Sequence, residues 1–122
     1  MNGSQFETLL TLVHRKHRFD ATNSWAQGSP TYFNALKQEV TEVEEELGMQ
    51  RRPHLEEELG DVLWNYLNLL LCLDDEHQIS ADNVLARTIQ KFDERVSGIE
   101  RGEAWVDIKA KQKQRLQMEE NT

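Results

Sequence analysis

The spacing of its apolar residues constrains the fold of this chain more than any other feature of the sequence. Apolar side chains recur at intervals of three and four residues almost everywhere, which is the period of an amphipathic helix. No segment shows a convincing period-two alternation, and only 2 prolines and 6 glycines interrupt the 122 residues. The sequence therefore predicts an all-α fold.

Helix start and stop signals divide the chain into four main helices. A capping box of Ser4 and Glu7 is expected to open the first helix, and Ser29 followed by Pro30 the second. The expected helices cover residues 4–18, 29–47, 54–74 and 80–98. Few apolar residues follow residue 101, so we expect a short helical or flexible tail there. The prediction is a four-helix-type bundle in a single domain over residues 1–122.

The second and fourth of these helices each carry a regular apolar stripe. We expect each of the two helices to end at a glycine. Gly48 is the expected stop of the second helix and Gly98 that of the fourth. The side chains expected to face the core are Leu36, Val40, Val43 and Leu47 in the second helix and Leu85, Ile89, Phe92 and Val96 in the fourth.

Cysteine content and charge indicate the cellular setting. The single cysteine, Cys72, excludes an internal disulfide and a cysteine-rich zinc site, which is typical of a reducing compartment. The first residues lack the basic and apolar regions of a signal peptide, and no run of about 18 apolar residues occurs. We therefore expect a cytoplasmic protein without a membrane partner. The formal net charge of −8 argues against binding to a nucleic-acid polymer.

Carboxylates line one edge of the second helix. Glu39, Glu42 and Glu46 follow one another at i, i+3 and i+7, beside the apolar stripe. Most glutamate-rich helix faces are simply solvated, and this edge alone would not indicate a site.

The third helix carries a polar stripe on an otherwise apolar surface. Glu58, Asp61, Asn65 and Asn68 fall at i, i+3, i+7 and i+10, within about 80° of one another on a helical wheel. A buried carboxylate without a partner costs several kcal/mol, so this stripe must be hydrogen-bonded, paired with Lys or Arg, or bound to cations.

The two acidic helices are joined by a short turn, which favours antiparallel packing. Glu39 and Glu42 would then face Glu58 and Asp61. Four oxygen donors without cysteine or histidine describe a site for a hard cation, Mg²⁺ or Mn²⁺ rather than zinc. Residues 39–61 contain nine carboxylates and two arginines, so they account for −7 of the net charge of −8.

The spacing of the acidic residues and the short motifs around them resemble those of a known family. Glu39-x-x-Glu42 is followed after 15 residues by Glu58-x-x-Asp61. This spacing is similar to the E-x-x-E and E-x-x-D signature of the MazG-like all-α nucleoside triphosphate pyrophosphohydrolases. The flanking words LKQEVTEV (36–43), ELGDVL (58–63) and KFDERV (91–96) match as well, so the resemblance covers residues 25–96.

The resemblance implies an activity and a role for individual residues. Family members hydrolyse nucleoside triphosphates to the monophosphate and pyrophosphate, often to clear non-standard or surplus nucleotides, and they commonly form dimers or tetramers. The implied magnesium ligands and catalytic residues are Glu39, Glu42, Glu58 and Asp61; the implied substrate contacts are Lys91 and Arg95 to phosphate, Asn65 to the sugar and Trp25 to the base. Many relatives have a glutamate where this chain has Gln38.

Several alternatives accompany this interpretation. Lys91 and Arg95 could form exposed ion pairs instead, Trp25 could close the core over a loop, and His17 could contact substrate or only solvent. The chain could belong to the phosphoribosyl-ATP pyrophosphohydrolase branch, or it could be a non-catalytic acidic helical interaction module. Trp64 and Leu71 would form an apolar patch in a monomer, so we expect a homodimer or homotetramer unless the C-terminal segment covers the patch.

Overall fold

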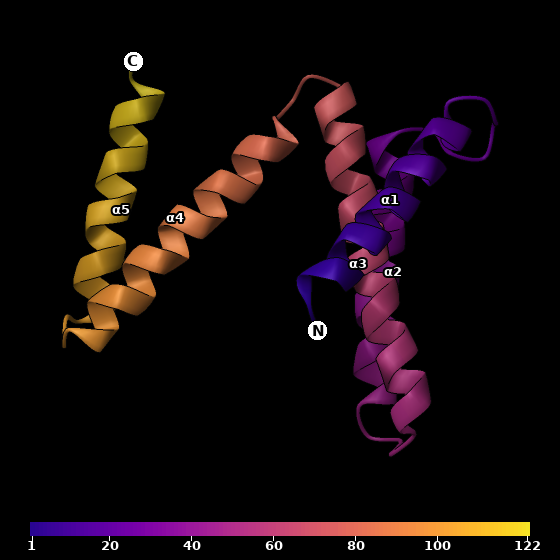
Figure 1. Ribbon diagram of the computed structural model, residues 1–122, viewed down its shortest axis with the longest axis horizontal. Helices are drawn as coiled ribbons and strands as arrows, with labels where there is room; N and C mark the ends of the chain where they lie inside the picture. The colour runs from indigo at the N-terminus through magenta and orange to yellow at the C-terminus, as the bar shows by residue number, and fades with distance from the viewer. The chain divides into compact units, whose positions relative to one another are not determined.

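The computed structural model describes all residues 1–122, and every regular element in it is an α-helix. The prediction of an all-α fold is therefore confirmed. The chain forms two compact units, residues 1–81 and residues 82–122. The helices are α1 (Gly3–Asp20), α2 (Ser29–Glu46), α3 (Arg52–Asp75), α4 (Ala81–Glu100) and α5 (Trp105–Glu120) (Figure 1). The single domain expected over residues 1–122 stays a prediction.

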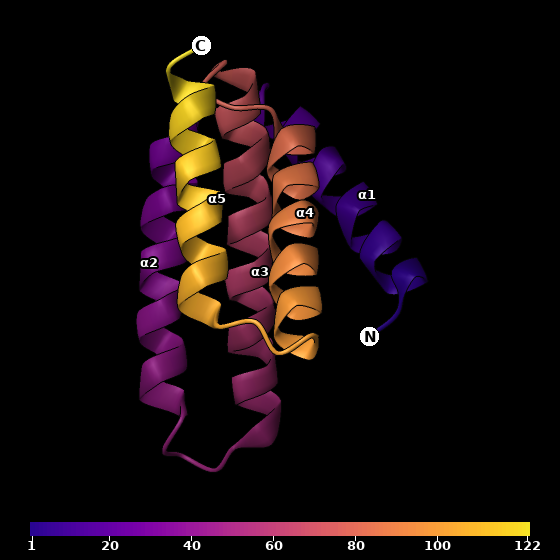
Figure 2. The ribbon, with the colours of Figure 1, turned by 90° about the vertical axis from the view of Figure 1, so that its left-hand side faces the viewer.

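The first unit is built on an antiparallel hairpin of α2 and α3. The two helices lie side by side along their length, and α1 packs across α3 (Figures 1 and 2). Tyr32, Leu69 and Cys72 form the buried centre of this unit. The partly buried side chains packed against them are Ala26, Leu36 and Leu73. Burial raises the pKa of the Cys72 thiol to about 11, so this thiol stays protonated at neutral pH.

The face of α2 that turns toward the interior differs from the predicted one. Tyr32 and Glu46 are buried, whereas Val40 and Leu47, both expected in the core, are more than half exposed. Tyr32 and Glu46 are buried and Leu36, Glu39 and Val43 are half-buried, and together they follow an i, i+4, i+7, i+11 and i+14 spacing. Two glutamates thus occupy positions where an apolar stripe alone would place aliphatic residues.

An ion pair at the α2–α3 turn explains one of these inward glutamates. Arg51 donates from Nε to Glu46 Oε1 (2.8 Å) and from Nη2 to Glu46 Oε2 (2.7 Å). This fork holds the pKa of Glu46 below its ordinary value. Because Glu46 ends α2 and Arg51 immediately precedes α3, the pair bridges the turn between the two helices.

The predicted capping box at the start of the chain is wrong in its residues. Asn2 is the N-cap of α1: its side-chain oxygen accepts from Gln5 N (2.9 Å), and Gln5 Oε1 accepts from Asn2 N (3.0 Å). Ser4 and Glu7 lie inside the helix. Asn caps a helix as well as Ser does, and Gln replaces Glu at the third position, so the box forms two residues earlier.

The second unit is an antiparallel hairpin of α4 and α5. The two helices meet at their connecting turn and diverge toward their other ends (Figure 1). Polar contacts span them, among them Arg95 Nε to Gln112 Oε1 (2.8 Å) and Arg115 Nη2 to Glu94 Oε2 (2.9 Å). The segment predicted as a short helical or flexible tail is thus a helix of 16 residues that pairs with its neighbour.

Two predictions for α4 are wrong. Gly98 does not end the helix, which continues to Glu100; the turn instead uses Gly102, whose φ of 86° suits glycine. The stripe Leu85, Ile89, Phe92 and Val96 is 44–71% exposed rather than buried. Within this unit α5 buries only Ile108, because most of its other residues are charged or polar.

Replacing Gly98 with Ala should destabilise the second unit. A Cβ on Gly98 would lie 2.5 Å from Ile108 Cδ1, well inside contact distance. Overpacking of this kind costs about 1–3 kcal/mol. Thermal unfolding followed by circular dichroism measures the loss. The matched control is Gly60→Ala in α3, where a Cβ meets nothing within 4 Å; there we expect a gain of about 0.5–1 kcal/mol. Equal effects of the two substitutions would contradict the assigned contact.

None of the five helices combines the length and the hydropathy that a membrane-spanning segment requires.

Candidate functional site

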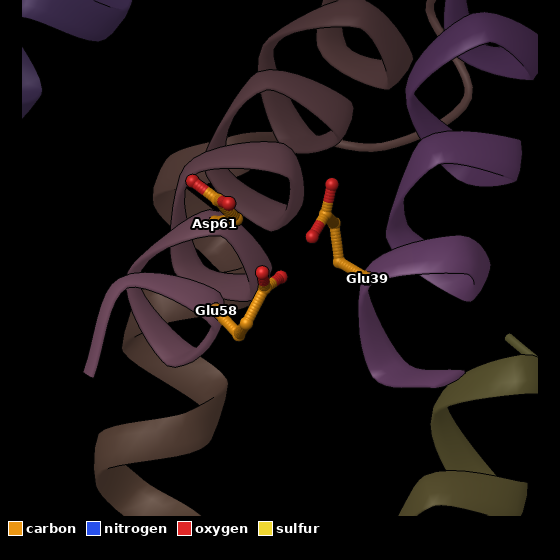
Figure 3. A group of neighbouring side chains, drawn as sticks. All are labelled: Glu39, Glu58 and Asp61. Carbon is orange, nitrogen blue, oxygen red and sulfur yellow. The ribbon is translucent and has the colours of Figure 1, made fainter. Parts of the chain in front are cut away.

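Three carboxylates from the two facing helices of the first unit converge on one point. Glu39 of α2 and Glu58 and Asp61 of α3 each direct one oxygen toward the others, and these three atoms lie within 4.8 Å of one another (Figure 3). Glu39 and Glu58 are half-buried and Asp61 is exposed. The structure therefore brings together three of the four acidic residues that the sequence singled out.

Local helix geometry accounts for this convergence. Glu39 follows the buried Tyr32 by seven residues, two full turns, so both side chains are on the face of α2 that turns toward α3. Glu58 and Asp61 are one turn apart on α3 and share a face. The short turn of residues 47–51, which the Glu46–Arg51 pair bridges, then limits which turn of α2 lies opposite which turn of α3.

The three carboxylates lack basic partners. The oxygens Glu39 Oε2 and Glu58 Oε2 are buried without a hydrogen-bond partner, and no Lys, Arg or His pairs with Glu39, Glu58 or Asp61. The alternative of a polar network tied to Lys or Arg is therefore absent here. Unpartnered buried carboxylate oxygens are costly, and they can be compensated by a proton or by a cation.

The proton affinity of the group is strongly perturbed. Burial, together with the neighbouring carboxylates of Glu42, Glu58 and Asp61, raises the pKa of Glu39 to about 7. Burial and the charges of Glu42 and Asp61 also raise the pKa of Glu58. Like charges held this close cannot all ionise at neutral pH unless positive charge is supplied.

Glu42 lies beside this group but supplies no oxygen to it. Hydrogen bonding with Glu39 and Glu58, and then with Gln38, lowers the pKa of Glu42. Glu42 therefore ionises at a lower pH than Glu39 does. Gln38 is a neutral hydrogen-bonding neighbour of Glu42.

The donor set fits a hard divalent cation. Three converging carboxylates, with a fourth next to them, offer only oxygen ligands, which suits Mg²⁺ or Mn²⁺ and not zinc. A bound cation would compensate the two buried carboxylate oxygens that lack a hydrogen-bond partner. Glu46, one turn beyond Glu42 on α2, already forms an ion pair with Arg51 and is not available as a ligand.

Asn65 and Asn68 continue the polar stripe of α3 inward. Both are buried, and each amide donates to the carbonyl oxygen four residues earlier: Asn65 Nδ2 to Asp61 O and Asn68 Nδ2 to Trp64 O, both at 2.9 Å. Asn65 is thereby fixed one turn from Asp61, adjacent to the carboxylates. Its contact with a sugar stays a prediction.

Trp25 lies in the loop between α1 and α2. The residue is 62% exposed, and its ring meets the Tyr32 ring edge-to-face, with centroids 6.0 Å apart. Tyr32 is two turns before Glu39, so this loop lies about 10 Å along the axis of α2 from the carboxylates. Trp25 therefore covers the core at Tyr32 and still presents a free aromatic surface.

His17 is engaged at the other end of α3. Its Nε2 lies 2.6 Å from Asp75 Oδ2. Asp75 is 17 residues after Glu58, which corresponds to about 25 Å along the helix axis. The structure thus separates His17 from the carboxylate group, and a substrate contact of His17 stays a prediction.

Lys91 and Arg95 lie on α4 in the second unit, on a groove of about 600 Å³ between α4 and α5. The guanidinium of Arg95 lies between two rings, 5.3 Å from the centroid of Phe92 and 5.0 Å from that of Trp105. Neither Lys91 nor Arg95 forms the ion pair considered as an alternative; Arg87 does, with Glu119. Phosphate binding by Lys91 and Arg95 stays a prediction.

Sequence reasoning missed the cluster that surrounds Trp25. Lys16 of α1 contacts Trp25, Tyr32 and Asp20 at once. The i, i+4 spacing of Lys16 and Asp20 is a recognisable helix pair. Nothing in the sequence links that pair to Tyr32, 12 residues further on, because the connection depends on how the loop folds.

Comparison with known proteins agrees with the sequence words noted above. Residues 27–99 match the family model of the MazG nucleotide pyrophosphohydrolase domain, which is more than half of the chain. The matched region contains the four acidic residues, Asn65, Lys91 and Arg95, while His17 and Trp25 lie before it. The comparisons with curated proteins and with solved structures gave no match.

Proposed function

The chain belongs to the MazG nucleotide pyrophosphohydrolase family, and we propose that it hydrolyses nucleoside or deoxynucleoside triphosphates to the monophosphate and pyrophosphate with Mg²⁺. A role in clearing surplus or non-standard nucleotides follows from this activity. The observation that carries the proposal is the group of Glu39, Glu58 and Asp61, whose converging oxygens include two that are buried without partners.

The carboxylates would hold the cation and take up the proton of the reaction. Glu39, Glu58 and Asp61, with Glu42 beside them, are the proposed ligands. A divalent cation supplies neutralisation of the phosphate oxygens and a lower pKa for the attacking water. Hydrolysis joins the oxygen of water to phosphorus, breaks the bridge between the α- and β-phosphates, and leaves one proton that a carboxylate of this group can accept.

The first unit also offers a fitting arrangement for the rest of a nucleotide. Asn65 is one turn from Asp61, and the loop of Trp25 lies about two turns of α2 away from Glu39, roughly 10 Å along the axis. A triphosphate at the carboxylates would place the sugar toward Asn65 and the base toward the exposed Trp25 ring. Aromatic rings bind bases by stacking. Lys91 and Arg95 are the proposed phosphate contacts.

A panel of substrates tests this function. Ribo- and deoxynucleoside triphosphates, together with phosphoribosyl-ATP, are incubated with the full chain and Mg²⁺, and released pyrophosphate and phosphate are measured separately. Pyrophosphate release supports the proposal, and its distribution over the panel gives the substrate. Inorganic phosphate as the only product would overturn it, and no product from any nucleotide would favour a non-catalytic role.

The stabilisation that Mg²⁺ gives should grow with pH. Because the pKa of Glu39 is raised to about 7 from an ordinary 4.5, the metal-free folded chain keeps a proton that the unfolded chain releases. Raising the pH from 4.5 to 7 therefore lowers the free energy of unfolding of the metal-free chain, and a bound cation restores it. Thermal unfolding with and without Mg²⁺ should show a larger shift at pH 8 than at pH 6, and Glu39→Gln should remove this difference. A shift independent of pH in the parent chain would contradict the assignment.

We also propose a homodimer or homotetramer. Trp64 and Leu71, the patch expected at an interface, are half-buried in the chain, so they retain part of their apolar surface for a contact. Sedimentation equilibrium tests the assembly, and a monomer at all concentrations would contradict it.

A further inference from the structure

We propose that Lys16 is a positioning residue for nucleotide binding: its ammonium group holds the Trp25 ring so that one face stays free to stack on a base. This inference rests on the proposed function, because it concerns how the same site binds its substrate. It assigns a role to a cation outside the carboxylate group and outside the region matched by the family model.

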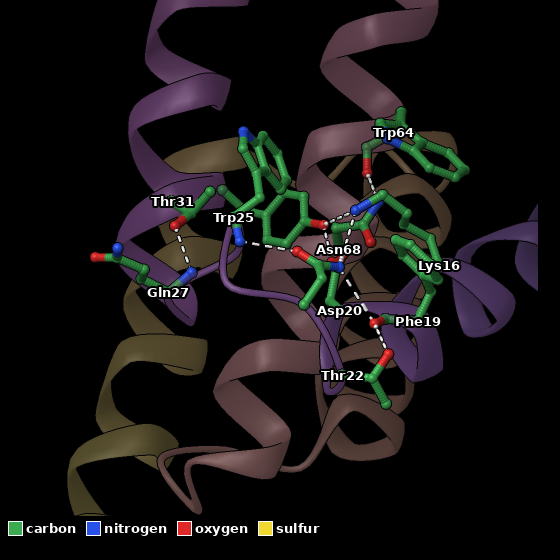
Figure 4. Close-up of polar contacts among 11 residues, drawn as sticks. Lys16, Phe19, Asp20, Thr22, Trp25, Gln27, Thr31, Trp64 and Asn68 are labelled. Carbon is green, nitrogen blue, oxygen red and sulfur yellow. Dashed lines mark hydrogen bonds and ion pairs between the residues drawn. The ribbon is translucent and has the colours of Figure 1, made fainter.

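The ammonium group of Lys16 is the centre of a compact cluster at the C-terminal end of α1. Lys16 Nζ lies 4.7 Å from the centroid of the Trp25 ring, donates to Tyr32 Oη (3.1 Å) and donates to an oxygen of Asp20 (Figure 4). Tyr32 Oη in turn donates to the other oxygen of Asp20. The side chain of Asp20 is 8% exposed, so its charge is balanced by Lys16 inside the protein.

Lys16 and Tyr32 both contact the Trp25 ring. The cation approaches the ring face, and the Tyr32 ring meets it at 76° between planes. The residue is nevertheless 62% exposed, so much of its surface remains accessible. A ring fixed on one side by a cation and an aromatic edge presents a flat apolar surface on its free side, which is the surface that a planar base requires.

The backbone of the loop is fixed as well. Trp25 N donates to Asn23 Oδ1 (2.8 Å), and Asn23 Nδ2 donates to Phe19 O (3.2 Å) at the end of α1. At the start of α2, Glu76 accepts from Ser29 N (2.8 Å) and Ser29 Oγ (2.7 Å). A loop anchored at both ends is ordered before binding, so Lys16 would need to fix only the ring, and little conformational entropy is lost when substrate arrives.

One hydrogen bond of the cluster does not involve Lys16. Tyr32 and Asp20 remain hydrogen-bonded to each other when the ammonium is removed, and Asp20 also accepts from Asn23 Nδ2 at 3.4 Å. We therefore expect a variant at Lys16 to keep the fold, which circular dichroism checks. It loses the ion pair with Asp20, the hydrogen bond to Tyr32 Oη and the contact with the Trp25 ring, and only the last of these involves the ring proposed to bind the base.

Steady-state kinetics of single and double variants test the proposal. Lys16→Met removes the charge and keeps the length of the side chain. It should raise KM for the best substrate of the panel about 3–10-fold and leave kcat unchanged, since it weakens binding of ground and transition state alike. Trp25→Ala should raise KM further, and Lys16→Met should add nothing in the Trp25→Ala background. Lys16→Arg should restore the parent KM.

A matched lysine provides the control. Lys37 Nζ lies 4.8 Å from the centroid of Phe33 on the exposed side of α2, so Lys37→Met removes a similar cation–ring contact outside the proposed base site. It should leave KM unchanged. A full effect of Lys16→Met in the Trp25→Ala background, or an unchanged KM in Lys16→Met, would overturn this inference alone. No pyrophosphate from the parent chain would overturn the proposed function and this inference with it.

Discussion

Replacing Glu58 with Gln should lower nucleotide hydrolysis by at least about 100-fold while the chain stays folded. Gln keeps the shape of the side chain, but it removes the negative charge from a group of only three converging carboxylates. It also gives the buried Oε2 position a neutral amide, so repulsion within the group falls. The metal-free variant should therefore be at least as stable as the parent, and it should lose the stabilisation by Mg²⁺.

The neighbouring residue supplies the control for this experiment. Glu57 is exposed on the same helix and takes no part in the group, so Glu57→Gln makes the same chemical change one position away. Pyrophosphate release and the shift in unfolding temperature with Mg²⁺ are measured for both variants. Parent-like hydrolysis by Glu58→Gln, or equal losses in the two variants, would show that the carboxylate group is not the reaction site.

Replacing Leu69 with Ala should cost about 2–5 kcal/mol of the free energy of unfolding of the first unit. Leu69 is 7% exposed and packs with Tyr32 and Cys72 in the buried centre of that unit. Removing three carbon atoms there forfeits their burial and leaves a cavity that the helices cannot fully close. Urea unfolding followed by circular dichroism gives the free energy.

A second leucine on the same helix separates burial from helix propensity. Leu59 is 51% exposed, so Leu59→Ala repeats the substitution in α3 without a comparable cavity. Ala favours a helix at least as much as Leu does, and the change in stability should stay within about 1 kcal/mol. Comparable losses for Leu59→Ala and Leu69→Ala would contradict the position of the core.

The sequence sufficed to predict the first four helices and the acidic pairs, because both follow from periods of three and four residues. It did not reveal which face of α2 turns inward. An apolar stripe predicts Val40 and Leu47 inside, yet Glu39 and Glu46 are the more buried residues. Arg51 compensates the buried charge of Glu46, and Glu39 is covered by the packing of α2 against α3. These are tertiary interactions that periodicity along one helix does not contain.

The contacts of Trp25 could not be predicted from the sequence, for a related reason. Between the first two expected helices the sequence predicts a loop that carries Trp25; in the structure this loop covers residues 21–28, because Asp20 still belongs to α1. The position of its ring depends on Lys16 from the preceding helix and Tyr32 from the following one. Contacts that close a loop are set by its backbone path, and side-chain types alone do not define that path.

The acidic group depends on the alignment of α2 with α3, and the ion pair at the turn between them lies outside that group. If α2 slid by one turn against α3, the shift of about 5.4 Å would exceed the 4.8 Å within which the three oxygens now lie. Both helices would persist, and the acidic group would be dispersed. Loss of Arg51 would leave the buried carboxylate of Glu46 without its partner at this turn, so a substitution of a residue that touches no proposed substrate contact would weaken the hairpin that holds the acidic group together.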